Sequence, residues 1–559
     1  MPRLAIFAVV LLALAGAFAC TSTTTISTAT KGPSEAPAGP VGATLLQGLG
    51  SYSMGGVTTN AVAQRWFDQG LNLAYGFNHD AAERSFLKAA EADPGCAMCW
   101  WGAALVLGPH VNAAMDPANN GKAWDRVGRA AKLAKTDAEK AWVKALTARY
   151  SANPPADRKP LDEAYAAAMA ELVRVRPNDL DAATMHAEAL MDLAPWNYYD
   201  ANARPMGRTT EFVATLESVL KRNSNHPGAL HLYIHAIEAS TNPDRGAAAA
   251  DRLRALVPGS GHLVHMPAHI YTRVGRYHDA VVVNEKAAAA DDVYLAACRP
   301  SPGTYPLGYV PHNHHFLWWA ASMEGASAKA LAAAEETRKR AAYPDLINQP
   351  GFEFLQDFWS TPIKAQVQFG KWDALLAAPQ PAAELRYASA IWQFGQGMAR
   401  LRKGQVSRAQ DHLEALAVAA NDAEFEKYLV GPKQALSRTV KIAERLLAGE
   451  IAAAREDYPA AIRAFARAIS LEDANAYFEP PLWYQPARQS LGSMLLKQKR
   501  FAEAEKVFRE DLARNRGNGW SLWGLARSLK AQGKPSEEVE KQFQAAWAHA
   551  DVTLQNATF

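Results

Sequence analysis

Histidine is unevenly distributed along this chain. Of its 15 histidines, 11 lie between His186 and His315, far more than an even spread over 559 residues would place there. Neutral imidazole is the commonest metal ligand in proteins. The spacing within this window therefore decides whether these side chains are ordinary core residues or a metal site.

Two segments have the spacing of helical metal ligands. In LHLYIHAIEAS, His231, His235 and Glu238 stand at i, i+4 and i+7 and share one helical face. Two imidazoles and a carboxylate suit zinc or non-haem iron. In GHLVHMPAHIY, the residues at i, i+3 and i+7 are all histidines, a set that suits zinc or copper: His262, His265 and His269.

Pro267 complicates the second segment. It either kinks a helix that carries all three histidines or occupies a first helical turn, which would leave His262 and His265 in the preceding loop. The three imidazoles could converge in either arrangement.

A third pair follows Pro311, which fits a first helical position. His312 and His315 are three residues apart and would share a face. A fourth group is Cys96 and Cys99, placed in the first turn of a predicted helix, where the helix dipole favours thiolate.

The cysteines leave several alternatives open. Cys96 and Cys99 could form a disulfide, a redox couple or the edge of a metal site in an oxidising compartment. Cys298 is predicted to be a buried apolar thiol.

Apolar residues recur at three- and four-residue intervals from residue 60 onward, which predicts an all-α fold. Short segments also repeat: an aromatic or aliphatic residue packs between alanines after a turn, as around Phe86, Phe465 and Phe508. Trp101-Gly102 and Trp523-Gly524 place a large residue beside a small one, as close helix packing requires. We expect a right-handed solenoid of tetratricopeptide-type helical hairpins, some lengthened or degenerate.

When the clusters are aligned with the positions of this repeat, they all fall on the same side of the array. His231, His235, Glu238 and the later histidines fall at positions that face the concave surface, as does His186. Helices in such arrays pack roughly 8–10 Å apart, so imidazoles from successive helices could meet over one ion.

The N-terminal segment indicates export. Residues 1–19 combine an early cation, an apolar run and small residues, as a secretory signal peptide does. Cys20 follows directly and is our preferred lipid-attachment site, with ordinary cleavage after Ala19 as the alternative. Residues 20–59 have the composition of a flexible tether, followed by repeat arrays at 60–345 and 346–559. We expect a periplasmic protein or a membrane-anchored lipoprotein.

The charge balance and the absence of several motifs argue against some classes of function. The chain has 59 Lys and Arg against 56 Asp and Glu, which argues against nucleic acid as a partner. The sequence has no phosphate-binding Gly-rich loop, no Gly-x-Ser-x-Gly elbow and no HExxH segment, which disfavours a phosphate-loop nucleotidase or a serine hydrolase.

Several segments together resemble a family of large bacterial exported tetratricopeptide-repeat proteins: FNHDAAERSFLKAAEADPGCAMCWWG, HLYIHAIEAS, GHLVHMPAHIYTRVGRY, PHNHHF and EPPLWY. The resemblance covers nearly all of residues 60–550. It implies the repeat fold and a location outside the cytoplasm, and it assigns no substrate, metal or catalytic residue.

These observations support three hypotheses. The first is a metal-dependent enzyme, an oxidoreductase or hydrolase, that holds copper, iron or zinc in its groove, with Tyr233, Tyr271 and Arg273 as further groove candidates. The second is an envelope scaffold that binds a peptide or small molecule there. The third is a metal storage or delivery protein. Membrane contact is expected only through a lipid at Cys20.

Overall fold

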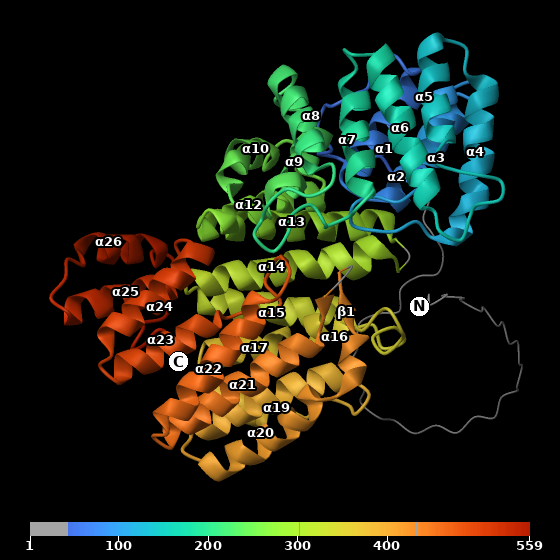
Figure 1. Ribbon diagram of the computed structural model, residues 1–559. Coiled ribbons are helices and arrows are strands. Elements are labelled where there is room, and N and C mark those ends of the chain that lie inside the picture. The colour runs from blue at the N-terminus through green and yellow to red at the C-terminus, as the bar shows by residue number, and fades with distance from the viewer. Residues whose placement is uncertain (1–42, 301, 432–433) are drawn as a thin grey trace, which may run out of the picture. The chain divides into compact units, whose positions relative to one another are not determined.

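Helices form nearly all the regular structure of the computed structural model, which describes residues 43–300, 302–431 and 434–559 (Figure 1). The first helices of the chain are α1 (Ala61–Tyr75), α2 (His79–Ala92), α3 (Ala97–Leu105), α4 (Asn120–Leu133), α5 (Asp137–Thr147), α6 (Lys159–Val175), α7 (Leu180–Asp192) and α8 (Thr209–Arg222). The central helices are α9 (Pro227–Ile237), α10 (Ala247–Leu253), α11 (Gly261–His265), α12 (Pro267–Arg273), α13 (Tyr277–Cys298), α14 (Val310–Met323) and α15 (Ser327–Arg340).

The later helices are α16 (Phe354–Trp359), α17 (Thr361–Gln368), α18 (Trp372–Ala377), α19 (Arg386–Arg402), α20 (Val406–Ala420), α21 (Ser437–Ala454), α22 (Tyr458–Asp473), α23 (Ala487–Lys497), α24 (Phe501–Arg514), α25 (Gly519–Ala531) and α26 (Glu537–Ala546). Two short strands, β1 (Leu429–Val430) and β2 (Gln434–Ala435), pair antiparallel. The remaining elements are single turns: η1 (Pro117–Asn119), η2 (Pro243–Gly246), η4 (Ala423–Glu426) and the π-helical η3 (Tyr305–Tyr309).

Consecutive helices pack as hairpins, including α1 with α2, α14 with α15, α19 with α20 and α21 with α22. A phenylalanine on the second helix of a hairpin fits against glycines on the helices before and after it. The Phe86 ring meets Gly70 and Gly102, and the Phe508 ring meets Gly492 and Gly524. Each glycine stands 16 residues from its phenylalanine (70 to 86 to 102; 492 to 508 to 524). The prediction of an all-α array of tetratricopeptide-type hairpins is confirmed.

The hairpin turns share one backbone conformation. A single residue between the two helices has positive φ, and this residue is usually glycine because side chains disfavour that region. Glycine occupies this position at Gly275, Gly325, Gly370, Gly404 and Gly533, whereas Phe77, Glu456 and Lys499 occupy it elsewhere. Phe77 is the aromatic exception, with φ of 53°.

Part of the predicted tether is ordered against the repeats. Residues 43–59 have no helix, yet Leu49 is buried and the Tyr52 hydroxyl donates to Asp181 at 2.9 Å. The Leu46 amide also donates to Gln69. The expectation of a flexible tether up to residue 59 is therefore wrong for residues 43–59, because their side chains find partners on the helices. The predicted signal peptide and Cys20 lie outside the described residues.

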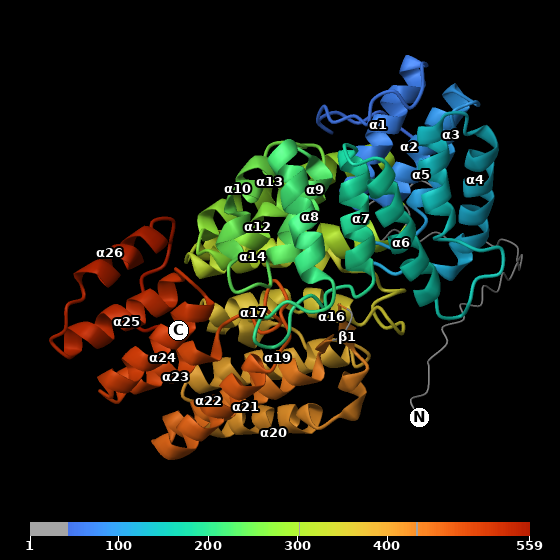
Figure 2. The ribbon, with the colours of Figure 1, turned by 45° about the horizontal axis from the view of Figure 1, so that its top comes forward.

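The two predicted arrays belong to one compact unit, Pro40–Phe559. Within it, α9, α12, α13 and α14 lie side by side in both views (Figures 1 and 2). None of the helices in the described part of the chain is long and apolar enough to cross a membrane.

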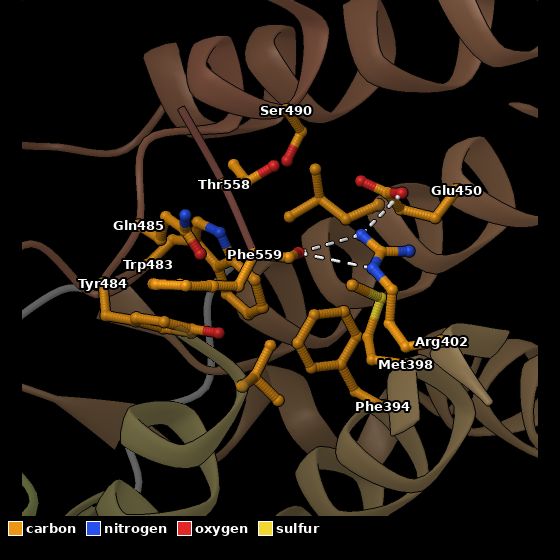
Figure 3. A pocket seen from close by; sticks show the side chains of 12 residues that line it. Phe394, Met398, Arg402, Glu450, Trp483, Tyr484, Gln485, Ser490, Thr558 and Phe559 are labelled. Carbon is orange, nitrogen blue, oxygen red and sulfur yellow. Dashed lines mark hydrogen bonds and ion pairs between the residues drawn. The ribbon is translucent and has the colours of Figure 1, made fainter. Parts of the chain in front are cut away.

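A small cavity lies in the later helices, where Arg402 contacts both Glu450 and the Phe559 carbonyl (Figure 3). Its volume of about 20 Å³ is enough for one water molecule. A cavity of this size has no room for a substrate.

The Gly102 contact predicts the cost of a single methyl group. A Cβ at Gly102 would lie 2.5 Å from the ring of Phe86, which is fully buried and has no room to move. We expect Gly102→Ala to lower the free energy of unfolding by about 1–3 kcal/mol. Gly128→Ala is the control, because a Cβ there meets nothing within 4 Å and should be neutral or stabilising by up to about 1 kcal/mol. Urea unfolding followed by circular dichroism tests both, and equal stabilities would contradict the packing account.

Candidate metal centre

Three imidazoles from two helices form the first cluster, which we call triad A: His231 and His235 on α9, and His262 on α11. One ring nitrogen of each lies within 4.8 Å of the others. The two α9 histidines are one helical turn apart, which places both on the same face. All three side chains are buried.

Hydrogen bonds fix the orientation of two rings in triad A. The Nδ1 of His231 donates to the Tyr75 carbonyl at 2.6 Å, and the Nδ1 of His235 donates to Glu238 Oε1 at 2.9 Å. In both rings the lone pair is then on Nε2. Neither Nε2 atom has a hydrogen-bond partner, and neither do the two nitrogens of His262. This pattern, with Nδ1 held by an oxygen and Nε2 free, is that of metal-ligating histidine.

The backbone of His262 is also held in place. Its amide donates to the Tyr305 hydroxyl at 3.2 Å, and this hydroxyl donates to buried Asp291 at 2.9 Å. Asn313 on α14 donates to the other oxygen of Asp291. The position of α11 is thus tied to α13 and α14.

The second cluster, triad B, takes one imidazole from each of three helices: His265 on α11, His269 on α12 and His312 on α14. The Nε2 atoms of His265 and His269 are 2.9 Å apart. The Nδ1 of His265 lies 2.7 Å from the Oδ1 of Asn284, whose amide group donates to a backbone carbonyl and so fixes the oxygen toward the ring. The lone pair of His265 is therefore on Nε2, the atom that faces His269 Nε2.

Pro267 begins a new helix and resolves the alternatives for this segment. It is the first residue of α12, while His262 and His265 lie on the separate short helix α11. The break lies between His265 and His269, which share triad B, whereas His262 on the same short helix as His265 belongs to triad A. The two triads therefore divide within α11, where His262 and His265 are three residues apart.

Glu238 lies between the triads and contacts an imidazole of each. Besides His235 in triad A, its Oε2 lies 2.6 Å from His269 Nδ1 in triad B. A second carboxylate, Glu479, is 3.3 Å from the same His269 nitrogen. Neither of these oxygens lies along the ring N–H direction, so the contacts at His269 are ionic. Glu238, predicted as a metal ligand, forms a third metal-compatible group with His269 and Glu479. It also contacts one imidazole of each triad.

Charge and burial separate His269 from the other histidines. Burial alone would lower the pKa of His269, but Glu238 and Glu479 raise it to about 10. Burial would raise the pKa of Glu238, but His269 and His235 lower it to about 2. Burial lowers the pKa of the other five triad imidazoles, and in four of them neighbouring imidazoles help to bring it well below the ordinary value: His231, His262, His265 and His312. These four are neutral near pH 7 and offer lone pairs.

Glu479 comes from the loop between α22 and α23, more than 200 residues after His269 on α12. Tyr477 in the same loop places its hydroxyl 3.4 Å from Glu238. The later repeats therefore complete a centre that the central helices begin, and EPPLWY is part of the site.

Aromatic rings surround the imidazoles. In triad A, Phe77 packs on His231, Trp196 on His235 and Tyr309 on His262, with ring centroids 4.4, 5.3 and 4.3 Å apart. In triad B, Phe316 contacts all three imidazoles. Side chains thus enclose the centre, and its location in the concave groove stays a prediction.

Two predicted ligands lie away from the triads. His315 packs against Trp318 and Phe358 and not against the imidazoles of triad B. Its neighbours include the buried ion pair of Asp357 and Lys364. His186 on α7 belongs to none of the metal-compatible groups of the described chain.

The cysteines are not metal ligands in this structure. Cys96 and Cys99 form a disulfide, so neither sulfur is a thiolate, and the disulfide alternative is the one observed. Cys298 is free and buried, as predicted.

Of the three additional groove candidates, two lie away from the imidazoles and one lies beside the centre. The hydroxyls of Tyr233 and Tyr271 donate to Glu217 and Asp251, away from the imidazoles. Arg273 lies beside the centre, with its guanidinium 5.3 Å from the Tyr477 ring.

Some site residues were not predicted. Asn284, Phe77 and Tyr309 contact the imidazoles, yet their types and spacing carry no ligand signal. His79 and His110 lie on the far side of Phe77 from His231 and belong to neither triad. Phe77 offered one usable signal, since other hairpin turns have glycine at its position.

Comparisons with known proteins give no family. No family model matches the chain, and no protein with a curated description matches it in sequence. Among solved structures, the human IFIT1 dimer with m7Gppp-AAAA is 12% identical over 89% of this chain and 91% of that chain, with a TM-score of 0.30. The APC/C hetero-tetramer Cut9-Hcn1 is 15% identical over 88% of each chain, with a TM-score of 0.29. Similarity at this level carries no inference about ligand or partner.

The role of Glu238 predicts how His269 titrates in metal-free protein. Glu238→Gln keeps the shape and removes the charge, so burial should dominate and the pKa of His269 should fall from about 10 by roughly 1–3 pH units. Glu217→Gln, on the far side of Tyr233, is the control and should leave it unchanged. Histidine NMR titration measures both, and an unchanged pKa in Glu238→Gln would contradict the assignment.

Proposed function

We propose that this protein is a metalloprotein that holds two metal ions, one on each triad. The observation that carries the proposal is the concentration of buried, unpartnered imidazole nitrogens in triad A: His231 Nε2, His235 Nε2 and both nitrogens of His262. A buried polar atom without a partner destabilises a fold by about 1–3 kcal/mol. A bound cation would satisfy these nitrogens together.

The donor set indicates the class of metal. Six imidazole nitrogens favour copper, zinc or iron, whereas calcium and magnesium prefer oxygen ligands. The carboxylates of Glu238 and Glu479 add negative charge next to His269, which offsets the charge of a bound cation.

The fixed geometry favours resident ions over storage. His231, His235 and His265 each have Nδ1 held by an oxygen of the protein. Such positioning raises metal affinity and fixes coordination geometry. A storage or delivery protein would instead need ligands that release ions readily.

We propose that the protein is an enzyme and that these two ions are catalytic. Three protein ligands per ion leave an open coordination position, which is the arrangement of catalytic rather than structural zinc sites. Oxidoreductase and hydrolase chemistry are both compatible with imidazole ligands. The histidines do not support the scaffold hypothesis, since buried side chains cannot contact a peptide in a groove.

Export remains a proposal that rests on residues 1–20. The Cys96–Cys99 disulfide supports it, because disulfides persist mainly outside the cytoplasm.

The two-ion arrangement predicts stoichiometry. Mature wild-type protein, loaded and desalted, should carry two ions per chain by mass spectrometry. His231→Ala should lose the ion of triad A and His312→Ala the ion of triad B, so each variant should retain one. His412→Ala, which removes a histidine of α20 far from the triads, should retain two.

The proposal would be overturned if wild-type protein were purified without metal and did not bind copper, zinc or iron after loading. Retention of two ions in either triad variant would show that the ions sit elsewhere.

Metal removal should also destabilise the fold, because ions bind only the folded triads. At a free metal concentration 100 times its dissociation constant, each ion should add about 2.7 kcal/mol to the free energy of unfolding. A chelator should therefore lower the urea midpoint of the wild type and leave that of a His231→Ala/His312→Ala double variant unchanged. Equal midpoints with and without chelator in the wild type would contradict the account.

A further inference from the structure

Triad A has three imidazole donors, and the groups around it are aromatic. Phe77, Trp196 and Tyr309 each cover one imidazole, and none of them supplies a metal-ligating atom of the usual kind. A fourth ligand to an ion on triad A must then come from outside the protein.

Tyr309 carries the one polar atom of these three rings that has no partner. Its side chain is buried, and its hydroxyl makes no hydrogen bond. Trp196, by contrast, donates its indole N–H to Asn112 Oδ1 at 3.1 Å. The same Asn112 side chain lies close enough to interact with the Tyr309 hydroxyl, although the two groups are not in hydrogen-bond geometry. Tyr309 therefore extends from His262 toward the residues that cover His235.

The backbone around triad A is unusual at three of its residues. Phe77 and Trp196 adopt positive φ, 53° and 59°, which is unfavourable for aromatic residues. Tyr309 ends the π-helical turn η3, a conformation that is rare and found frequently at functional sites. Local strain of this kind is retained where a specific side-chain position is required.

We propose that an ion on triad A keeps an open coordination position that accepts a small oxygen- or nitrogen-donor ligand, and that the Tyr309 hydroxyl donates a hydrogen bond to this ligand. The inference rests on the metal-binding function proposed above and adds the class of ligand to it. The orphaned hydroxyl beside His262 is the observation that carries it.

The enclosure limits the ligand to a few atoms. All three triad A side chains are at most 2% exposed, and aromatic rings cover them. Water, hydroxide, dioxygen and azide are of suitable size, whereas a peptide or sugar is not. His312 is only partly buried, so the side of triad B is the more open to entry.

The test uses cobalt(II), whose visible spectrum reports its coordination, and azide as the probe ligand. The His312→Ala chain isolates triad A and should bind one cobalt ion. Azide should perturb the cobalt spectrum, and Tyr309→Phe in the same chain should weaken azide binding about tenfold, the loss expected for one hydrogen bond to a charged ligand.

Tyr198→Phe is the matched control. Its hydroxyl is also buried without a partner, but its ring packs on Phe212 rather than on an imidazole. Azide affinity should be unchanged in this variant. Helicity and cobalt content are measured in every chain, and removal of an unpartnered hydroxyl should alter neither.

Three results would overturn the inference, and each contradicts a different part of it. If one cobalt ion binds and azide leaves its spectrum unchanged, triad A has no open position. If azide binds equally well to the Tyr309→Phe chain, the hydroxyl does not contact the ligand; in both cases the metal site itself stands. If no cobalt binds to wild type or His312→Ala, the proposed function fails and this inference with it.

Discussion

The contacts of Glu238 are the constraint on which this centre depends. A fully buried carboxylate is stable only with compensating positive charge or hydrogen-bond donors. Glu238 finds both in imidazoles, with one oxygen on His235 and the other on His269. Because these two histidines belong to different triads, a single side chain sets the orientation of an imidazole in each. Placement of α9, α12 and the loop that carries Tyr477 is tied to the same group.

The repeat architecture supplies the remaining geometry. Packing of successive hairpins brings the helices close enough for side chains on α9, α11, α12 and α14 to meet. Two departures from the repeat then shape the site. The short helix α11 carries one histidine of each triad, His262 and His265. At the first hairpin turn, Phe77 occupies the position that glycine usually holds and places a ring between His231 and His110.

Much of the centre could be predicted from the sequence, because the signals were local. Pairs at i and i+4, such as His231 and His235, need only a helix to share a face. The hairpin repeats were predictable for the same reason, from Phe86 and Gly102 among others. Glu479 could be placed only near the site, because its contact with His269 depends on a loop from a distant hairpin. The contact of His315 with Trp318 could not be predicted from spacing, because residues at i and i+3 share a helical face. The sequence could not decide whether Glu238 binds an ion directly or positions the ligands. That question depends on interatomic distances, which residue spacing does not give.

Anomalous X-ray diffraction from crystals of the metal-loaded protein, collected at the absorption edge of the bound metal, tests the central claim most directly. The account predicts two peaks, one bounded by the Nε2 atoms of His231 and His235 with a His262 nitrogen, and one bounded by the imidazoles of His265, His269 and His312. Each peak should lie about 2.0–2.2 Å from its ligand nitrogens. Glu238 should contact His235 and His269 without touching either ion. Strong peaks only elsewhere in the protein, or a single ion bound directly by Glu238 and Glu479, would contradict it.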